Sequence, residues 1–394
     1  MNKKNNIIIN ILILIIFIGF MLSELFDFVF LRSFDEVLAL FAIPIIFYLI
    51  FKRKNKIFHV AVILFLLLIC LGVLSSFIFR INSISIYGYF LDAFLFSKPY
   101  LILIAGILLF LNYDLSISLK AINIISKIML FIIFIFSMYF LTENAFFING
   151  RRDEFTFTTN FTGALANWII LFLLIIVYCN KYNIIYIIMG LIIMYANGSG
   201  LGYLGIGIII LIYKFFSRFR FKWYYIIFLS IILICLSWNE ISGYLLNNVA
   251  PRYKLYYYSF ITANTYFPFG SGFGTYGTYV AYKYYSPLYI EYGFINEYGM
   301  SNAYVGPVFL YDTYYPTIVA QFGYFGIILF AIMYYSYFKK GLKILIDTKE
   351  KLMFITIFAY IAALGLGFNL SSACSLLFIY SVLFCVFKKR SDYV

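Results

Sequence analysis

The chain has 394 residues, of which 64% are hydrophobic and 11% charged, and its formal net charge is +13. A mean hydropathy of +0.97 excludes an ordinary soluble domain and predicts an integral membrane protein. In such a protein, lysine and arginine mark the cytoplasmic side. Nucleic acid is therefore not an expected partner.

Apolar runs along the chain predict an all-α polytopic membrane protein with about twelve transmembrane helices. A hydrocarbon core about 30 Å thick needs roughly 20 apolar residues per helix. We expect one membrane domain over residues 1–394, whose first span is retained because no small-residue cleavage site follows it. The predicted spans are residues 7–22, 37–51, 57–79, 91–111, 121–141, 163–179, 184–196, 200–213, 223–238, 316–338, 352–368 and 371–387.

The distribution of positive charge predicts how these spans are oriented. Most of the 29 lysines and arginines lie in alternate loops and at the two chain ends. Because positively charged residues are retained in the cytoplasm, both termini are predicted to be cytoplasmic. Residues 142–162 and 239–315 are then outer loops, and the second, between spans nine and ten, is large.

The large loop contains a segment that is unusual for a membrane protein. It holds nearly half of the 39 tyrosines, together with FPFGSGFGTYGTY, residues 267–279, which we name the glycine segment. Glycines let backbone N–H groups approach a polar ligand and form an anion-binding nest. Tyrosine rings suit the faces of a sugar. We therefore predict substrate binding by Gly270, Gly272, Gly274, Tyr276 and Tyr315.

Cations on the outer loops point to a phosphate ligand. Arginine binds diphosphate through a planar fork of donors that stays charged at every relevant pH. Arg151, Arg152 and Arg252, with Lys254, are the candidates, although surface solvation explains Arg151 and Arg152 equally well. No metal is expected from the five cysteines, which lie in apolar runs without metal-ligand spacing.

A carboxylate is the expected general base on the outer face. The single histidine, His59, lies at the cytoplasmic start of the third span. Asp312, just before Pro316 and the tenth span, is the candidate that a rigid helix end could orient. A helix N-cap is the alternative role for Asp312.

Three local motifs, taken in order along the chain, resemble the O-antigen polymerase and O-antigen ligase family of bacterial surface polysaccharide synthesis. Arg152 precedes Gly163 by eleven residues in RDEFTFTTNFTG. Arg252, in APRYKLYYYSF, comes before the glycine segment, which is similar to a Pro-x-Gly-x-Gly-x-Gly turn. DTYYPTIVAQFGYFG, residues 312–326, resembles the motif leading into the next span.

The resemblance implies a glycosyltransferase that joins polyprenyl-diphosphate-linked repeat units on the outer leaflet of the bacterial inner membrane. Arg152 and Arg252 would hold the diphosphate, aided by Arg151 and Lys254, and Asp312 would activate the acceptor hydroxyl. Neutralisation by arginine makes a metal or other cofactor unnecessary. A chain-length regulator and a flippase are possible partners. Ligases commonly have histidine where this chain has Asp312, which favours a polymerase.

Three alternatives stay open. The first is an O-antigen ligase, which shares the chemistry but uses another acceptor. The second is a flippase or transporter of the same lipid-linked sugars, which would need a charged path through the membrane. The third is a metal-dependent lipid-sugar glycosyltransferase that uses the adjacent carboxylates Asp35 and Glu36. The roles of Asp92, Lys98 and Lys127, within or near the spans, are also open.

Overall fold

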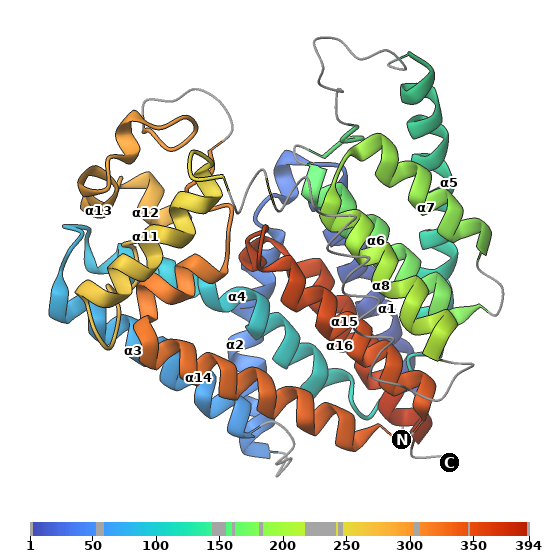
Figure 1. Ribbon diagram of the computed structural model, residues 1–394. Helices are drawn as coiled ribbons and strands as arrows, with labels where there is room; N and C mark the ends of the chain where they lie inside the picture. Colours follow the sequence, from blue (N-terminus) through green and yellow to red (C-terminus); the bar gives the residue numbers. More distant parts are fainter. Residues whose placement is uncertain are drawn as a thin grey trace.

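A computed structural model describes residues 3–52, 59–143, 155–159, 162–180, 184–216, 242, 247–302, 308–345 and 347–391. Every regular element in these ranges is a helical one (Figure 1). The α-helices are α1 (Lys3–Phe20), α2 (Phe34–Lys52), α3 (His59–Phe79), α4 (Ile86–Phe110), α5 (Ser116–Glu143), α6 (Thr162–Cys179), α7 (Ile184–Asn197), α8 (Gly200–Phe216), α11 (Pro251–Thr265), α12 (Tyr279–Lys283), α13 (Pro287–Glu291), α14 (Tyr315–Ile344), α15 (Thr348–Leu364) and α16 (Cys374–Ser391). Short helical turns are η1 (Met21–Leu25), η2 (Val29–Leu31), η4 (Phe294–Asn296) and η5 (Leu370–Ser372).

The prediction of an all-helical membrane protein is confirmed. Within the described ranges, six helical segments are long and apolar enough to cross a membrane: Lys4–Leu25, Val60–Phe79, Ile86–Phe110, Ser116–Glu143, Thr162–Cys179 and Tyr315–Ile344. Helix α7 and the first part of α16 are apolar but shorter. Each other predicted span corresponds to a helix, except residues 223–238, which lie outside the described residues. The total of about twelve spans remains a prediction.

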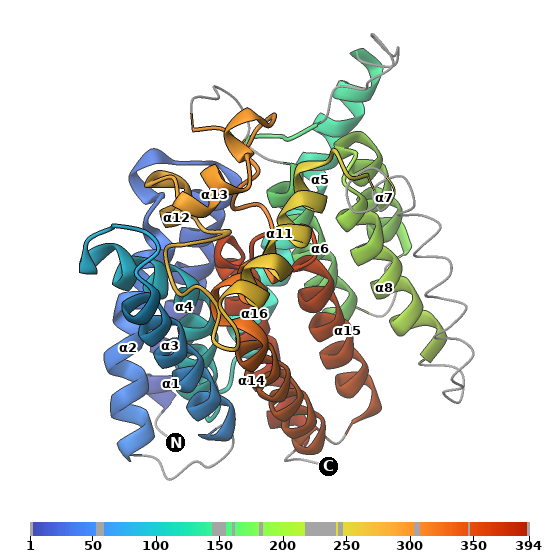
Figure 2. The same ribbon diagram turned by 60° about the vertical axis from the view of Figure 1, so that its left-hand side comes forward.

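The helices form one assembly with two distinct ends. Helices α2, α3, α4 and α14 pack together on one side, and α5, α6, α7 and α8 on the other, with α15 and α16 between them (Figure 1). Figure 2 shows the start of α1 and the end of α16 at one end, with α11, α12 and α13 at the opposite end. The chain therefore begins and ends on the same side of the assembly.

Helix α6 lies at the centre of the second group because its sequence is apolar on every face. Within the assembly, 78% of the apolar stretch of α6 is buried, whereas only 28% of that of α3 is buried. A helix that is hydrophobic all round is buried by its neighbours or by lipid. On α3, side chains such as Ile63, Leu66 and Leu67 are exposed. We infer that this exposed apolar face of α3 contacts lipid.

The glycine segment fits into a break in α14. The break lies at Gly323, where φ is 60° and ψ is −165°. In a continuous helix the carbonyls of Ala320 and Gln321 would accept N–H groups four residues ahead. Here Ser271 N–H donates to Ala320 O and Gly272 N–H to Gln321 O, each at 2.9 Å. A break in an apolar helix persists when neighbouring groups satisfy the freed backbone in this way.

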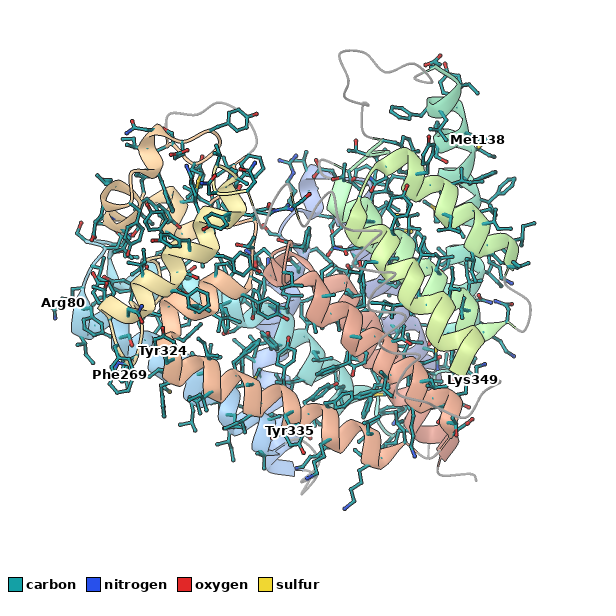
Figure 3. The ribbon with its side chains drawn as sticks, viewed as in Figure 1. Arg80, Met138, Phe269, Tyr324, Tyr335 and Lys349 are labelled. Carbon is teal, nitrogen blue, oxygen red and sulfur yellow. The ribbon has the colours of Figure 1, made fainter. Side chains whose placement is uncertain are left out.

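Glycine is required in this segment for close contact between backbones. Gly272 has φ +86°, and a Cβ there would overlap the backbone nitrogen of Ser76 in α3. The same edge of the molecule is aromatic: Figure 3 shows Phe269 and Tyr324 at the edge that also carries Arg80. The glycine segment thus joins α3 to the broken α14 and supports the first half of α14, which begins three residues after Asp312.

Candidate functional site

The structure brings two of the predicted catalytic residues into direct contact. Arg252 lies in the first turn of α11, and Asp312 lies three residues before α14 begins. Arg252 Nε and Nη2 lie 2.7 and 2.6 Å from Asp312 Oδ2. The side chains are 23% and 25% exposed. Sixty residues apart in sequence, they form a partly buried ion pair at the end of the assembly that carries α11.

The environment of Asp312 acts on its carboxyl in two opposite directions. Burial raises the pKa of Asp312 above its ordinary value, while the Arg252 guanidinium and its hydrogen bond lower it. The effect of burial is larger, since a charged carboxylate loses solvation there. Asp312 N–H donates to Phe309 O at 3.1 Å, so the carboxylate is carried by a turn rather than by a helix. Asp312 therefore does not cap α14 with a side-chain hydrogen bond, and Tyr314 is the N-cap residue.

Two tyrosines attach this pair to the last turn of α15 and to the α15–α16 link, residues 365–373. Tyr256, one turn after Arg252 on α11, donates its hydroxyl to Leu366 O at 2.9 Å. Tyr315 donates its hydroxyl to Ala362 O at 2.6 Å. Burial raises the pKa of Tyr256, so its hydroxyl stays protonated. Our sequence analysis missed Tyr256, although its four-residue spacing from Arg252 on a helix could have indicated it.

The same link also contacts the turn that carries Asp312. Asn369 Nδ2 donates to Tyr311 O at 3.0 Å. On the other side, a Cβ added to Gly163 would meet the ring of Phe368 at 3.1 Å. The link thus lies between the start of α6 and the Asp312 turn. The motif that ends at Gly163 and the motif that begins at Asp312 are far apart in the chain, and both therefore border the α15–α16 link.

Arg151 and Arg152 lie outside the described residues. The described residues that follow them are attached to other elements: Phe155 N–H donates to Ala196 O at 3.1 Å, and Asn197 Nδ2 donates to Phe155 O at 2.8 Å. The roles of the two arginines therefore remain predictions from the sequence.

Lys254 is paired with a different carboxylate from Arg252. Its Nζ lies 2.5 Å from Glu297 Oε2. Residues two apart on a helix point in different directions. The structure therefore separates Lys254 from the Arg252–Asp312 pair, and we do not assign it to the same ligand.

The predicted anion-binding nest is occupied by the protein itself. Gly270 N–H donates to Tyr266 O at 2.8 Å. Gly274 N–H donates to Asp92 Oδ2 at 2.6 Å. With Gly272 bonded to α14, the N–H groups of all three predicted glycines have internal acceptors. They shape the scaffold in this structure, because the close approach that glycine permits is to backbone rather than to a ligand.

Tyr276 belongs to the same scaffold. It is fully buried, and its hydroxyl donates to Leu255 O at 2.7 Å. Gln321 Nε2 donates to Tyr276 O at 2.9 Å and to Asp92 Oδ2 at 3.1 Å. Asp92, buried within α4, thus holds the glycine segment against α14, a role that sequence spacing alone did not reveal.

A second polar cluster surrounds the carboxylates considered for a metal. Lys98 Nζ lies 2.5 Å from Asp35 Oδ2, and Asp35 Oδ1 accepts Glu36 N–H at 2.9 Å. Ser375 donates to Glu24 Oε2 at 2.5 Å. A lysine thus supplies the positive charge beside Asp35. Among the described residues, no three His, Cys, Asp or Glu side chains form a group that could hold a metal ion.

An apolar groove lies between the helices of the assembly. It runs among α2, α3, α4, α14, α15 and α16, and its lining includes Phe65, Leu103, Tyr100, Tyr334, Tyr337 and Tyr380. The Tyr100 hydroxyl is 2.7 Å from that of Tyr314. Tyr314 comes two residues after Asp312. The buried Tyr100–Tyr314 contact therefore links one wall of the groove to the segment that carries Asp312.

These features define a class: a helical membrane protein with a partly buried arginine–carboxylate pair at one end of the assembly and an apolar groove between its helices. A scan against models of known protein families found no match to this chain. Searches of curated proteins and of solved structures also found none. The site itself must therefore carry any functional argument.

Proposed function

We propose that this protein is a membrane glycosyltransferase that polymerises polyprenyl-diphosphate-linked oligosaccharide repeat units, as in the synthesis of O-antigen, capsule or exopolysaccharide. The observation that carries the proposal is the contact between Arg252 and Asp312. The resemblance of the sequence motifs to O-antigen polymerases supports the same function. In this proposal transfer occurs at the outer face of the bacterial inner membrane, and both termini are cytoplasmic.

Each residue of the pair has a defined task in such a reaction. An acceptor hydroxyl attacks the anomeric carbon of the donor, and the bond from that carbon to a phosphate oxygen breaks. The departing diphosphate takes the electron pair, and Arg252, with Arg152 as the second predicted cation, stabilises its charge. Asp312 receives the proton of the attacking hydroxyl. Tyr256 and Tyr315 act as positioning residues through the α15–α16 link.

The apolar groove fits the lipid part of the proposed substrate. A polyprenyl chain is a branched hydrocarbon, and ligand sites are mostly apolar with a few polar groups that fix orientation. The groove offers Phe65 and Leu103 as apolar walls, with Tyr100 at the position nearest the Asp312 segment.

The proposal is tested by expressing Arg252→Ala and Asp312→Ala separately in a strain that lacks the native gene. We expect lipid-linked single repeat units to accumulate and polymer to disappear, as measured by gel analysis and mass spectrometry of the extracted glycans. The matched control is Arg32→Ala, which removes an exposed ion pair with Asp27 (3.1 Å) on the η2 turn. Its polymer should be normal.

Three results would overturn the assignment. Full-length polymer in both variants would remove Arg252 and Asp312 from the reaction. Free polymer that is no longer joined to lipid A core would indicate a ligase. Failure of repeat units to reach the outer leaflet would indicate a flippase or transporter.

A further inference from the structure

The geometry of the Arg252–Asp312 pair is distinctive. Both Nε and Nη2 of Arg252 approach the same oxygen, Oδ2 of Asp312, at 2.7 and 2.6 Å. Charge-assisted hydrogen bonds of this length are the strong kind. The guanidinium charge is therefore neutralised by the carboxylate, and that carboxylate oxygen already accepts two donors.

Under the proposed function, both groups are needed elsewhere. Arg252 must donate to phosphate oxygens, and Asp312 must accept a proton from a sugar hydroxyl. The contact in this structure opposes both tasks, because it occupies the Nε–Nη2 edge of Arg252 and because the guanidinium lowers the basicity of the carboxylate. A diphosphate can use that edge only after the pair opens.

The chain provides the means for a local exchange. Arg252 is in the first turn of α11, and the Tyr256–Leu366 hydrogen bond fixes that helix one turn later. Asp312 is on the turn before α14, outside any helix. The arginine side chain is long, and both side chains reach solvent. The two groups can therefore separate by side-chain rotation without moving a helix.

We propose that Asp312 occupies the anion position on Arg252 in the resting protein and that the substrate diphosphate replaces it there. A diphosphate carries more than one negative charge and offers several acceptor oxygens, so it competes effectively for the guanidinium. Its arrival releases the Asp312 carboxylate, which is then able to receive the acceptor proton. This inference rests on the proposed function and adds to it an ordered activation: the base becomes competent only when the donor is bound.

A neighbouring ion pair on the same helix gives a matched control. Lys254 and Glu297 lie 2.5 Å apart, and their side chains are 18% and 35% exposed. Glu297 follows the η4 turn, and removing it deletes a partly exposed carboxylate that pairs with α11 without touching Arg252. Any general electrostatic effect of losing one negative charge near α11 should therefore appear in Glu297→Gln as well.

The test measures binding of farnesyl diphosphate and of inorganic pyrophosphate to the purified full-length protein in lipid nanodiscs. We expect Asp312→Asn to bind both ligands about threefold to tenfold more tightly than the wild type, because a partly exposed competing ion pair has been removed. The same variant should lose transfer activity. Glu297→Gln should bind like the wild type, and Arg252→Ala should bind much more weakly. Asp312→Ser serves as the second variant if Asp312→Asn does not fold.

Failure of this inference can be distinguished from failure of the proposed function. Unchanged or weaker binding by the Asp312 variants, with binding still dependent on Arg252, would overturn the exchange and leave the polymerase proposal intact. Equal tightening in Glu297→Gln would also overturn the exchange, because the effect would then be a general one of charge. Wild-type binding that is absent, or that is unaffected by Arg252→Ala, would overturn the proposed function itself.

Discussion

At the scale of single residues, the chemistry of this protein centres on one guanidinium and one carboxylate. Arg252 and Asp312 are each common residue types, and neither is informative alone. Their contact at 2.6 Å, at 23% and 25% exposure, gives them a joint role. Partial burial strengthens the pair relative to a fully exposed one, while access to solvent leaves it open to a ligand.

The planar fork of Arg252 should matter as much as its charge. We expect Arg252→Lys to reduce polymer formation by about 10-fold to 100-fold, because an ammonium cannot donate two parallel hydrogen bonds to a diphosphate. Initial rates of repeat-unit joining in membrane vesicles measure this. Activity equal to the wild type would show that only positive charge is required at this position.

The buried setting of Asp312 predicts an acidic limit to activity. The base works as a carboxylate, so transfer should fall as pH drops through the pKa of Asp312. Burial raises that pKa. The pH at which half of the activity is lost should therefore be higher than the pKa of about 4 of an exposed aspartate. A pH profile of transfer in vesicles checks this. A rate that stays constant down to pH 4 would contradict a role for Asp312 as the base.

At the scale of elements, the break in α14 and the glycine segment depend on one another. The break at Gly323 exposes carbonyls within an apolar assembly, and the segment supplies their donors. Thr317, in the first turn of α14, donates to Gly277 O at 2.8 Å. This contact extends the support to the turn next to Asp312. The glycines are thus needed for the site although they do not face it.

Two glycine substitutions distinguish the loss of stability caused by a strained backbone from the loss caused by overlap with α3. Gly272 and Gly293 both have positive φ, but a Cβ at Gly293 would meet nothing within 4 Å. We expect Gly293→Ala to lower the free energy of unfolding by about 1 kcal/mol. Gly272→Ala should lower it by at least about 3 kcal/mol, since its Cβ would overlap the α3 backbone.

Thermal unfolding in detergent, followed by tryptophan or dye fluorescence, measures both variants. The comparison is internal, because each carries the same added methyl group at a left-handed position. Equal stability of the two variants would show that the segment can move away from α3 at little cost, and would remove its supporting role.

At the scale of the whole molecule, the two ends of the assembly differ in what they carry. The turn after α4 contacts the start of the chain: Asn10 Nδ2 donates to Asp114 O at 2.6 Å. The opposite end carries α11 to α13 and the Arg252–Asp312 pair (Figures 1 and 2). If the positive-inside pattern is right, the first end is cytoplasmic and the second lies outside.

Cysteine labelling tests this orientation. Tyr298, which is 65% exposed, lies at the end with α13, and Asn112, also exposed, follows α4. A membrane-impermeant maleimide should label Tyr298→Cys in intact cells or spheroplasts. It should label Asn112→Cys only after the membrane is opened. The unsubstituted protein, with its native cysteines, gives the background. The reverse pattern would invert the topology and place the pair in the cytoplasm.

The sequence by itself determined the class of the protein and most of its helices. Membrane insertion follows from local composition, because about 20 consecutive apolar residues satisfy the bilayer wherever they occur in the chain. The same local reasoning identified Arg252 and Asp312 as candidates, since the chemistry of a side chain belongs to the residue itself. Residues 151, 152 and 223–238 lie outside the described structure, so the expectations for them remain those of sequence.

Only the tertiary structure decided which residues meet. The glycine segment was predicted to face a ligand, yet it pairs with a broken helix and with Asp92 of α4. Lys254 was grouped with Arg252, yet it bonds Glu297. In each case the partner is distant in sequence or on another side of a helix. Hydrogen bonds and ion pairs form only within a few ångströms, and such distances depend on how whole helices pack.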